Sequence, residues 1–595
     1  MSIPLNMTIP AIHQAYSKGT TPMQVIQTVF SKIAEVNDPG IFITLFDQED
    51  VEKAAQALGE FDPSMPLWGI PFAIKDNIDA EGYETTAGCP EYAYAPDKDA
   101  FVVAELKKAG ALLIGKTNLD QFATGLVGVR TPYGAPLNSI DPKIVPGGSS
   151  GGSGVAVGHG IVSFSLGTDT AGSGRVPAAL NNIVGLKPTL GALSATGVVP
   201  ACKSIETVSI FALTVGDAYT AFQVANAYDE KDSYARKIKN LTLSQPATGL
   251  KIGIPSKSTI KFMDDTIQEK SFYDSISLLK DQGYQIIEID FAPLYDVAEM
   301  LYYGAWVAER YTVIEDLLKT KPDAILPVTK KIISLAENLS AADAFRGFYK
   351  LKELARIAEA ELSNVDLLCV PTIPTFYSVK DLEADPVTPN SNFGTYTNFV
   401  NLLDMCGIAV PTPAREDGRP GSVTLLAGKD EDALVASIAT SLETAGARNL
   451  GATDQLFNTE IELNESPKTT ITIAVCGAHM DGLPLNKDLI SRNAIFKSKA
   501  VSAPSYKFYA LAGGPPKRPG MVRCEGGKSG NIEMELWDMP LEHFGSFMAT
   551  IPHPLGIGSV ELIDGSFVKG FICEAAGTDG ATDITELASW RKFIN

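Results

Sequence analysis

Two stretches rich in glycine and small hydroxyl residues, 147–154 and 167–175, constrain this chain more than any other part of its sequence. Glycine at this density lets the backbone adopt positive φ and lets a substrate approach main-chain N–H groups closely. The hydroxyl groups in such loops are unshielded, as a nucleophile must be. A flexible surface linker has a similar composition. The first stretch, however, continues into the apolar segments 155–157 and 161–166, so we expect an active site instead.

Three motifs in this part of the chain resemble the signature of the amidase signature hydrolases. They are GIPFAIKDN at 69–77, GGSSGGS at 147–153 and GTDTAGSGRVP at 167–177. The family uses a triad of a serine, a cis-serine and a lysine. Carried over by motif position, the resemblance implies that Ser173 is the nucleophile, Ser149 the bridging serine and Lys75 the base.

The chemistry of the residues alone does not decide which side chain acts as the base. A serine hydroxyl is a weak nucleophile without one. Lys75 follows an apolar strand, where desolvation favours the neutral amine, but lysines at strand ends are as often simply solvated. His159 lies beside the loop, in a position more typical of a helix end. The resemblance favours Lys75.

The same resemblance implies how the rest of the nucleophile loop is used. The backbone N–H groups of Thr170, Ala171 and Gly172 would form the oxyanion hole, where fixed donors meet the developing negative charge. We expect Asp169 and Arg175 to pair and brace the loop without reacting.

Strands and helices alternate along the first three-quarters of the chain, which predicts an α/β fold. With the resemblance, this becomes an amidase-signature fold with a large mixed sheet covered by helices. Around residues 445–470 the pattern lapses into polar sequence, and alternating strands follow. We therefore expect a catalytic domain at 1–445, a linker at 446–468 and a small β-rich α+β domain at 469–595.

The C-terminal part carries a second resemblance. The segments CGAHMDGLPL at 476–485, 509–520 and 539–545 are similar to the accessory domain of the allophanate hydrolase family. This resemblance implies hydrolysis of allophanate (urea-1-carboxylate) to ammonia and carbon dioxide, downstream of a biotin-dependent urea carboxylase. It also implies that His479 takes part in decarboxylating the first product. A purely structural histidine, in a domain that only supports assembly, is the alternative.

An anionic amide needs a fixed cation, and the planar guanidinium of arginine suits a carboxylate best. Arg310 follows Tyr302 in a segment that, as one continuous helix, would place them about 12 Å apart along its axis. The subfamily resemblance marks both as substrate-binding residues. From the residues alone, an exposed Arg310 paired with Glu309 or another acid is the simpler interpretation.

Composition excludes several classes of partner. The net charge of −21 argues against binding nucleic acid or an anionic membrane. The seven cysteines are scattered, which indicates a reducing, cytoplasmic setting, and no motif calls for a metal or another cofactor. We expect a homodimer. Three other interpretations stay open: another amidase-signature amidohydrolase, a glutamine-dependent amidotransferase A subunit, and a C-terminal domain without chemistry.

Overall fold

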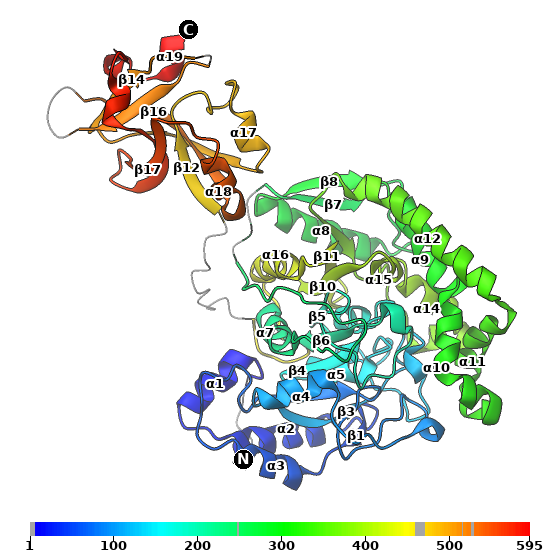
Figure 1. Ribbon diagram of the computed structural model, residues 1–595. Helices are drawn as coiled ribbons and strands as arrows, with labels where there is room; N and C mark the ends of the chain where they lie inside the picture. Colours follow the sequence, from blue (N-terminus) through cyan, green and yellow to red (C-terminus); the bar gives the residue numbers. More distant parts are fainter. Residues whose placement is uncertain are drawn as a thin grey trace. The chain divides into compact units, whose positions relative to one another are not determined.

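The computed structural model describes residues 6–244, 246, 249–457, 470–514, 516–524 and 529–594. These residues divide into two compact units, the first built from 6–243 and 250–457 and the second from 244, 246, 249 and the described residues from 470 on (Figure 1). The first unit extends past the expected boundary at residue 445, because Asn182 Nδ2 donates to the carbonyls of Asn449 and Gly451. Residues 458–468 of the expected linker lie outside the described residues.

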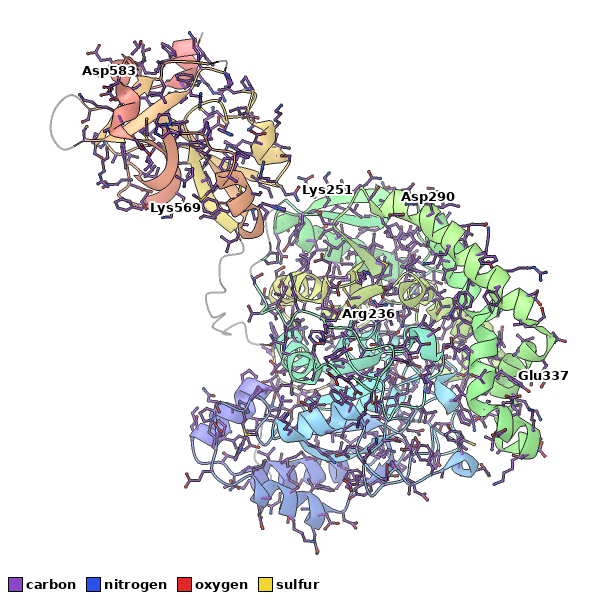
Figure 2. The ribbon with its side chains drawn as sticks, in the orientation of Figure 1. Arg236, Lys251, Asp290, Glu337, Lys569 and Asp583 are labelled. Atoms are coloured by element: carbon purple, nitrogen blue, oxygen red, sulfur yellow. The ribbon has the colours of Figure 1, made fainter. Side chains whose placement is uncertain are left out.

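The first unit is built on one mixed sheet of eleven strands, as the alternation of strands and helices predicts. The spatial order of its strands is β1 (Phe42–Leu45), β3 (Leu112–Thr117), β2 (Pro71–Lys75), β4 (Phe164–Thr168), β6 (Val208–Ala212), β5 (Val184–Lys187), β10 (Met405–Thr412), β11 (Gly421–Gly428), β9 (Leu367–Pro371), β7 (Lys251–Pro255) and β8 (Gln285–Ile289). Strands β3, β2 and β4 run parallel, as do β9, β7 and β8. Figure 2 labels Lys251, which begins β7, and Asp290, which follows β8, at opposite ends of that pair.

Both faces of the sheet are covered by apolar side chains. Alternate residues of β9 belong to two different hydrophobic clusters, Leu367 and Cys369 to one and Leu368 and Val370 to the other. The first cluster includes residues of α2, α4, α7, α8 and α16, and the second includes residues of α6, α9, α12 and α15. Since successive side chains of a strand point to opposite faces, the sheet lies between two helical layers.

Some helices of the first unit begin at a side-chain cap. Helix α2 begins with Pro22 after a complete capping box between Thr21 and Gln24. The helices are α1 (Ile9–Ser17), α2 (Pro22–Val36), α3 (Gln48–Ala57), α4 (Phe101–Lys108), α5 (Gly151–Gly158), α6 (Val176–Leu180), α7 (Val215–Ala225), α8 (Thr266–Asp281), α9 (Ala292–Tyr303), α10 (Trp306–Thr320), α11 (Pro327–Ile333), α12 (Ala341–Leu362), α13 (Val379–Ala384), α14 (Thr388–Phe393), α15 (Asn398–Leu402) and α16 (Asp432–Thr444).

The second unit is β-rich, as expected. A five-stranded sheet has the order β13 (Ile495–Val501), β16 (Glu533–Pro540), β12 (Thr470–Val475), β18 (Phe567–Cys573) and β17 (Leu555–Glu561). A three-stranded sheet contains β15 (Pro519–Arg523), β14 (Tyr506–Ala510) and β19 (Thr582–Asp583), and the helices are α17 (Lys487–Ile490), α18 (Leu541–Met548) and α19 (Trp590–Ile594). A hairpin joins β17 and β18, and Gly565 lies in its turn at a φ of 83°.

Candidate active site

The parallel strands β2 and β4 bring the predicted base to the glycine-rich loops. Lys75 is the last residue of β2 and Thr168 the last of β4, so both lie at the same edge of the sheet. Lys75 is fully buried, and its Nζ donates to Ser149 Oγ and to Thr168 Oγ1, each at 2.7 Å. The contact that the proposed triad requires between Lys75 and Ser149 is therefore present.

Burial changes the acidity of the Lys75 amine. Desolvation lowers the pKa of Lys75 to about 8, against the opposing charges of Glu206, Asp120 and Asp169. A pKa near 8 leaves an appreciable neutral fraction around neutral pH, which a base needs. The histidine considered from sequence lies elsewhere: His159 caps the C-terminal end of α5, while Ser149 lies before its start.

The loop that carries Ser149 is held closely by Asp120. The peptide between Gly148 and Ser149 is cis, and the Ser149 carbonyl accepts from the Asp120 amide at 3.0 Å. A β-carbon at Gly148 would overlap Asp120 Oδ2 and the Gly128 nitrogen, so only glycine fits there. Local packing therefore explains one of the glycines in the motif.

An internal ion pair braces the nucleophile loop. Arg175 donates through Nε and Nη2 to the two carboxylate oxygens of Asp169, each at 2.9 Å, and both side chains are fully buried. The same carboxylate accepts from the amides of Gly172 and Gly174 at 2.8 and 3.0 Å. Burial raises the pKa of Asp169, but Arg175 and these donors outweigh it and hold the pKa below its usual value. The expected pairing is confirmed.

The loop geometry refines two expectations about this site. The Gly172 amide is already used by Asp169, whereas the amides of Thr170 and Ala171 donate to no other described residue. Ser173 is 3% exposed, and no hydrogen bond joins its hydroxyl to that of Ser149 within the described residues. The proposed relay therefore requires the Ser173 hydroxyl to turn toward Ser149.

The segment that holds Tyr302 and Arg310 differs from the expected continuous helix. The helix is interrupted between α9 and α10. At this interruption, a β-carbon at Gly304 would overlap the Met300 carbonyl. The break brings the Arg310 guanidinium to 5.2 Å from the centre of the Tyr302 ring. A straight helix would have kept the two side chains apart, so the prediction of continuity was wrong.

Arg310 is buried and has unused donors. It is 2% exposed, and Nη1 donates to Thr124 Oγ1 at 3.4 Å. Its Nε and Nη2, and the Tyr302 hydroxyl, are buried without a hydrogen-bond partner in the described part of the chain. The simpler interpretation, an exposed arginine paired with Glu309, was wrong, because Glu309 accepts from the amide and hydroxyl of Ser204 instead. Buried, unpaired guanidinium donors are suited to an anion.

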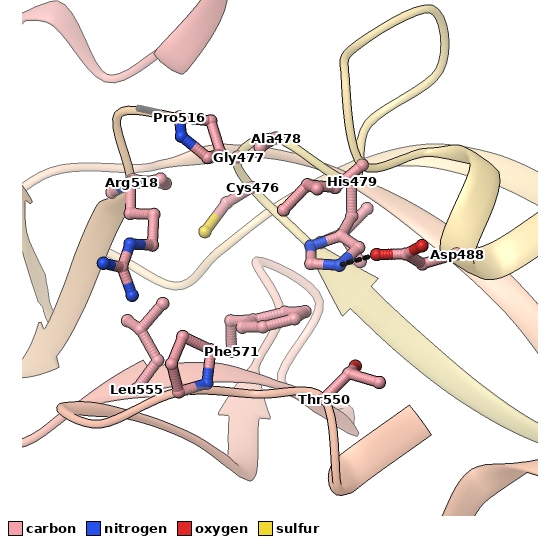
Figure 3. Close-up of a pocket in the computed structure, with 14 residues that line it drawn as sticks. Cys476, Gly477, Ala478, His479, Asp488, Pro516, Arg518, Thr550, Leu555 and Phe571 are labelled. Atoms are coloured by element: carbon pink, nitrogen blue, oxygen red, sulfur yellow. Dashed lines mark ion pairs between the residues drawn. The ribbon is translucent and has the colours of Figure 1, made fainter. Parts of the chain in front are cut away.

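The second unit contains a cavity of about 200 Å³, and His479 lines it (Figure 3). His479 stacks on Phe571, and its Nε2 lies 3.9 Å from Asp488 Oδ2. Burial lowers the pKa of His479 to about 4, against the opposing charge of Asp488, so the imidazole is neutral at neutral pH.

The cavity also contains a permanent cation, Arg518, to which the sequence assigned no role. Arg518 lines it from the opposite side to His479, with its guanidinium directed inward (Figure 3). The two residues come from loops that only folding brings together. Cys476 also lines the cavity, and burial raises the pKa of its thiol to about 12, so it is not a thiolate at neutral pH.

No group of three or more His, Cys, Asp or Glu side chains among the described residues is placed to hold a metal ion. No helix in the same residues is long and apolar enough to cross a membrane.

Comparisons with known proteins agree with both units. Residues 24–435 match the amidase family, and residues 471–595 match the allophanate hydrolase C-terminal domain. The chain is 44% identical over 546 residues to the urea amidolyase of Lachancea kluyveri, a match that covers 89% of this chain and 30% of that protein. The chain thus spans less than a third of the length of that relative.

A solved structure covers nearly the whole fold. The structure of Kluyveromyces lactis allophanate hydrolase is similar with a TM-score of 0.79 and 42% identity, over 99% of each chain. The A subunit of the glutamyl-tRNA(Gln) amidotransferase of Carboxydothermus hydrogenoformans is 33% identical, over 72% of this chain and 94% of that protein. The expected amidase-signature fold is confirmed by these matches.

Proposed function

The chain belongs to the amidase family and carries an allophanate hydrolase C-terminal domain, and from this we propose that it hydrolyses allophanate through Lys75, Ser149 and Ser173. The observation that carries the hydrolytic chemistry is the buried Lys75 amine, 2.7 Å from the Ser149 hydroxyl. A lysine with its pKa lowered to about 8 is a base of suitable strength.

The reaction begins with proton transfer toward Lys75. Its neutral amine takes the Ser149 proton, Ser149 takes the proton of Ser173, and Ser173 Oγ attacks the amide carbonyl carbon. The tetrahedral oxyanion then lies against the free amides of Thr170 and Ala171. Collapse breaks the C–N bond, and the relay returns the proton to the departing nitrogen, which leaves as ammonia.

Water completes the cycle. It gives a proton to the relay and attacks the acyl-enzyme ester, which releases the Ser173 hydroxyl and N-carboxycarbamate. Ser149 can transfer a proton in either direction, because a hydroxyl group both donates and accepts hydrogen bonds.

The choice of substrate depends on Arg310. Its free Nε and Nη2 and the free Tyr302 hydroxyl are donors suited to the carboxylate of allophanate. A glutamine-dependent amidotransferase A subunit is the second candidate. It is less well supported, because that relative covers 72% of this chain whereas the K. lactis allophanate hydrolase covers 99%.

For the second unit we propose decarboxylation of N-carboxycarbamate in the cavity of His479. Arg518 would hold the dianion while the bond from nitrogen to one carboxylate breaks and carbon dioxide leaves. The nitrogen would take a proton from water, relayed by neutral His479, which gives carbamate. We further propose that the protein is a homodimer. We also propose that it uses the product of a biotin-dependent urea carboxylase, and its similarity to urea amidolyase supports this link.

The test is ammonia release from allophanate, malonamate, biuret and glutamine by the purified chain. Ser173→Ala is expected to abolish release from allophanate. Ser163→Ala is the matched control, because this serine is also buried but lies outside the glycine-rich stretches 147–154 and 167–175. This variant should retain activity. Preferential turnover of glutamine by the unaltered chain would overturn the substrate assignment but leave the triad intact.

A further inference from the structure

Glu206 is a buried carboxylate beside the nucleophile loop that the reaction above does not use. It lies just before β6, where the pairing of β4 with β6 continues past the end of β4, because the Asp169 amide donates to the Thr207 carbonyl at 2.8 Å. Its Oε2 accepts from Thr170 Oγ1 at 2.7 Å and from the Ala201 amide at 2.6 Å. Glu206 therefore fixes the first residue of the proposed oxyanion hole.

The position of Thr170 relates Glu206 to the base. Thr168 binds the Lys75 amine, and Thr170 binds Glu206. Thr168 and Thr170 are two residues apart in the chain, so Lys75 and Glu206 are bound to the same short segment of the nucleophile loop.

The other oxygen of Glu206 lacks a hydrogen bond from any described residue that would compensate for its burial. Oε1 is buried and has no hydrogen-bond partner in the described part of the chain. Such an oxygen is costly unless nearby cations compensate for its lost hydration. Burial raises the pKa of Glu206, and the cations that oppose this rise are Lys75 and Arg310, the two that the proposed reaction uses.

We propose that Glu206 is a positioning residue of the hydrolytic site, which orients the oxyanion loop through Thr170 and supplies the negative charge that balances Lys75 and Arg310. This inference depends on the proposed hydrolysis by Lys75, Ser149 and Ser173. Glu206 would thus affect both the acidity of Lys75 and the geometry of the nucleophile loop.

Two other carboxylates, Asp120 and Asp169, also act on Lys75, and each has hydrogen-bond partners of its own. Asp169 is neutralised by its two-point pair with Arg175, and Asp120 accepts from the amides of Gly128 and Arg130. Among the groups that act on Lys75, Glu206 has the largest opposing effect. Removing its charge should thus lower the pKa of Lys75 further.

The experiment compares the pH dependence of kcat/KM for allophanate in three variants of the full chain. Glu206→Gln keeps an oxygen acceptor for Thr170 but loses the charge, so the rising limb of the profile should move to lower pH. Thr170→Val keeps the charge but loses the hydroxyl, so kcat should fall about tenfold, the effect of a lost hydrogen bond, with the limb unmoved. Thr170→Ser should restore most of that loss.

An unmoved limb in Glu206→Gln, with activity retained, would overturn the inference, because the residue would then carry no charge in the working enzyme. Equal falls in kcat without a limb shift in Glu206→Gln and Thr170→Val would assign it a structural role only. Thermal unfolding of each variant separates these outcomes from loss of fold. If Ser173→Ala kept activity, the proposed function itself would fail, a result independent of Glu206.

Discussion

The Lys75 amine and the Ser149 hydroxyl, 74 residues apart in the chain, lie 2.7 Å apart in the interior of the first unit. Both side chains are completely buried, so bulk solvent does not screen this contact from the field of the surrounding groups. A lysine in such a place binds its proton weakly, and in the proposed relay the Ser149 hydroxyl carries the proton between Lys75 and Ser173.

Replacing Lys75 by methionine should lower kcat for allophanate at least about 10³-fold, because the relay loses its base. Lys187→Met is the matched control. Lys187 is equally buried, with a pKa lowered by burial to about 8, but its Nζ donates to the carbonyls of Pro188 and Met405. Steady-state ammonia release should fall in the first variant and persist in the second; similar losses in both would contradict the assignment.

The pH dependence should report the Lys75 amine. The neutral amine is the active form, and burial lowers its pKa to about 8. Activity should accordingly rise as the pH increases through about 8 and level off above it. The measurement is kcat/KM for allophanate between about pH 6 and 10; a profile that falls over this range would exclude a lysine base.

Arg310→Lys should raise KM for allophanate about 10- to 100-fold, because a point charge does not replace the two free donors of the guanidinium. Turnover of biuret, which has no carboxylate, should change little. Arg415→Lys is the control, since Arg415 is also buried but pairs with Asp265 and Asp417. Equal effects on both substrates would remove Arg310 from the carboxylate site.

Asp169→Asn should lower the free energy of unfolding by about 3–5 kcal/mol, because the Arg175 guanidinium would stay buried without its counter-charge. Asp404→Asn breaks the exposed pair with Arg236 and should cost less than about 1 kcal/mol. Urea denaturation followed by circular dichroism measures both. Equal destabilisation would mean that the loop does not depend on the buried pair.

His479→Ala should leave the first release of ammonia unchanged and let N-carboxycarbamate accumulate, if the second unit decarboxylates it. Burial lowers the pKa of His479 to about 4, so the second step should not vary with pH between about 6 and 8 through this residue. Carbon-13 NMR of labelled substrate follows the intermediate. Carbon dioxide formation at the original rate would show that the cavity is not required.

Much of the candidate site was predictable because its residues lie in short, contiguous motifs. Lys75 ends an apolar strand, and Ser149 and Ser173 lie in loops whose glycines are dictated by close packing, as at Gly148. Residues that act from a distance left no such signal. Glu206 and Arg518 lie outside any motif that assigns them a role, and only folding brings them to the sites.

The sequence by itself determined the alternation of strands and helices and the β-rich character of the second unit, because periodicity and capping are local properties, and its motifs implied the proposed triad through their family resemblance. Tertiary structure decided the rest. It broke the helix between Tyr302 and Arg310, committed the Gly172 amide to Asp169 and buried Lys75 so that its amine loses its proton more easily. Each of these depends on which distant groups surround a residue, and burial and charge are set by the packing of the whole chain.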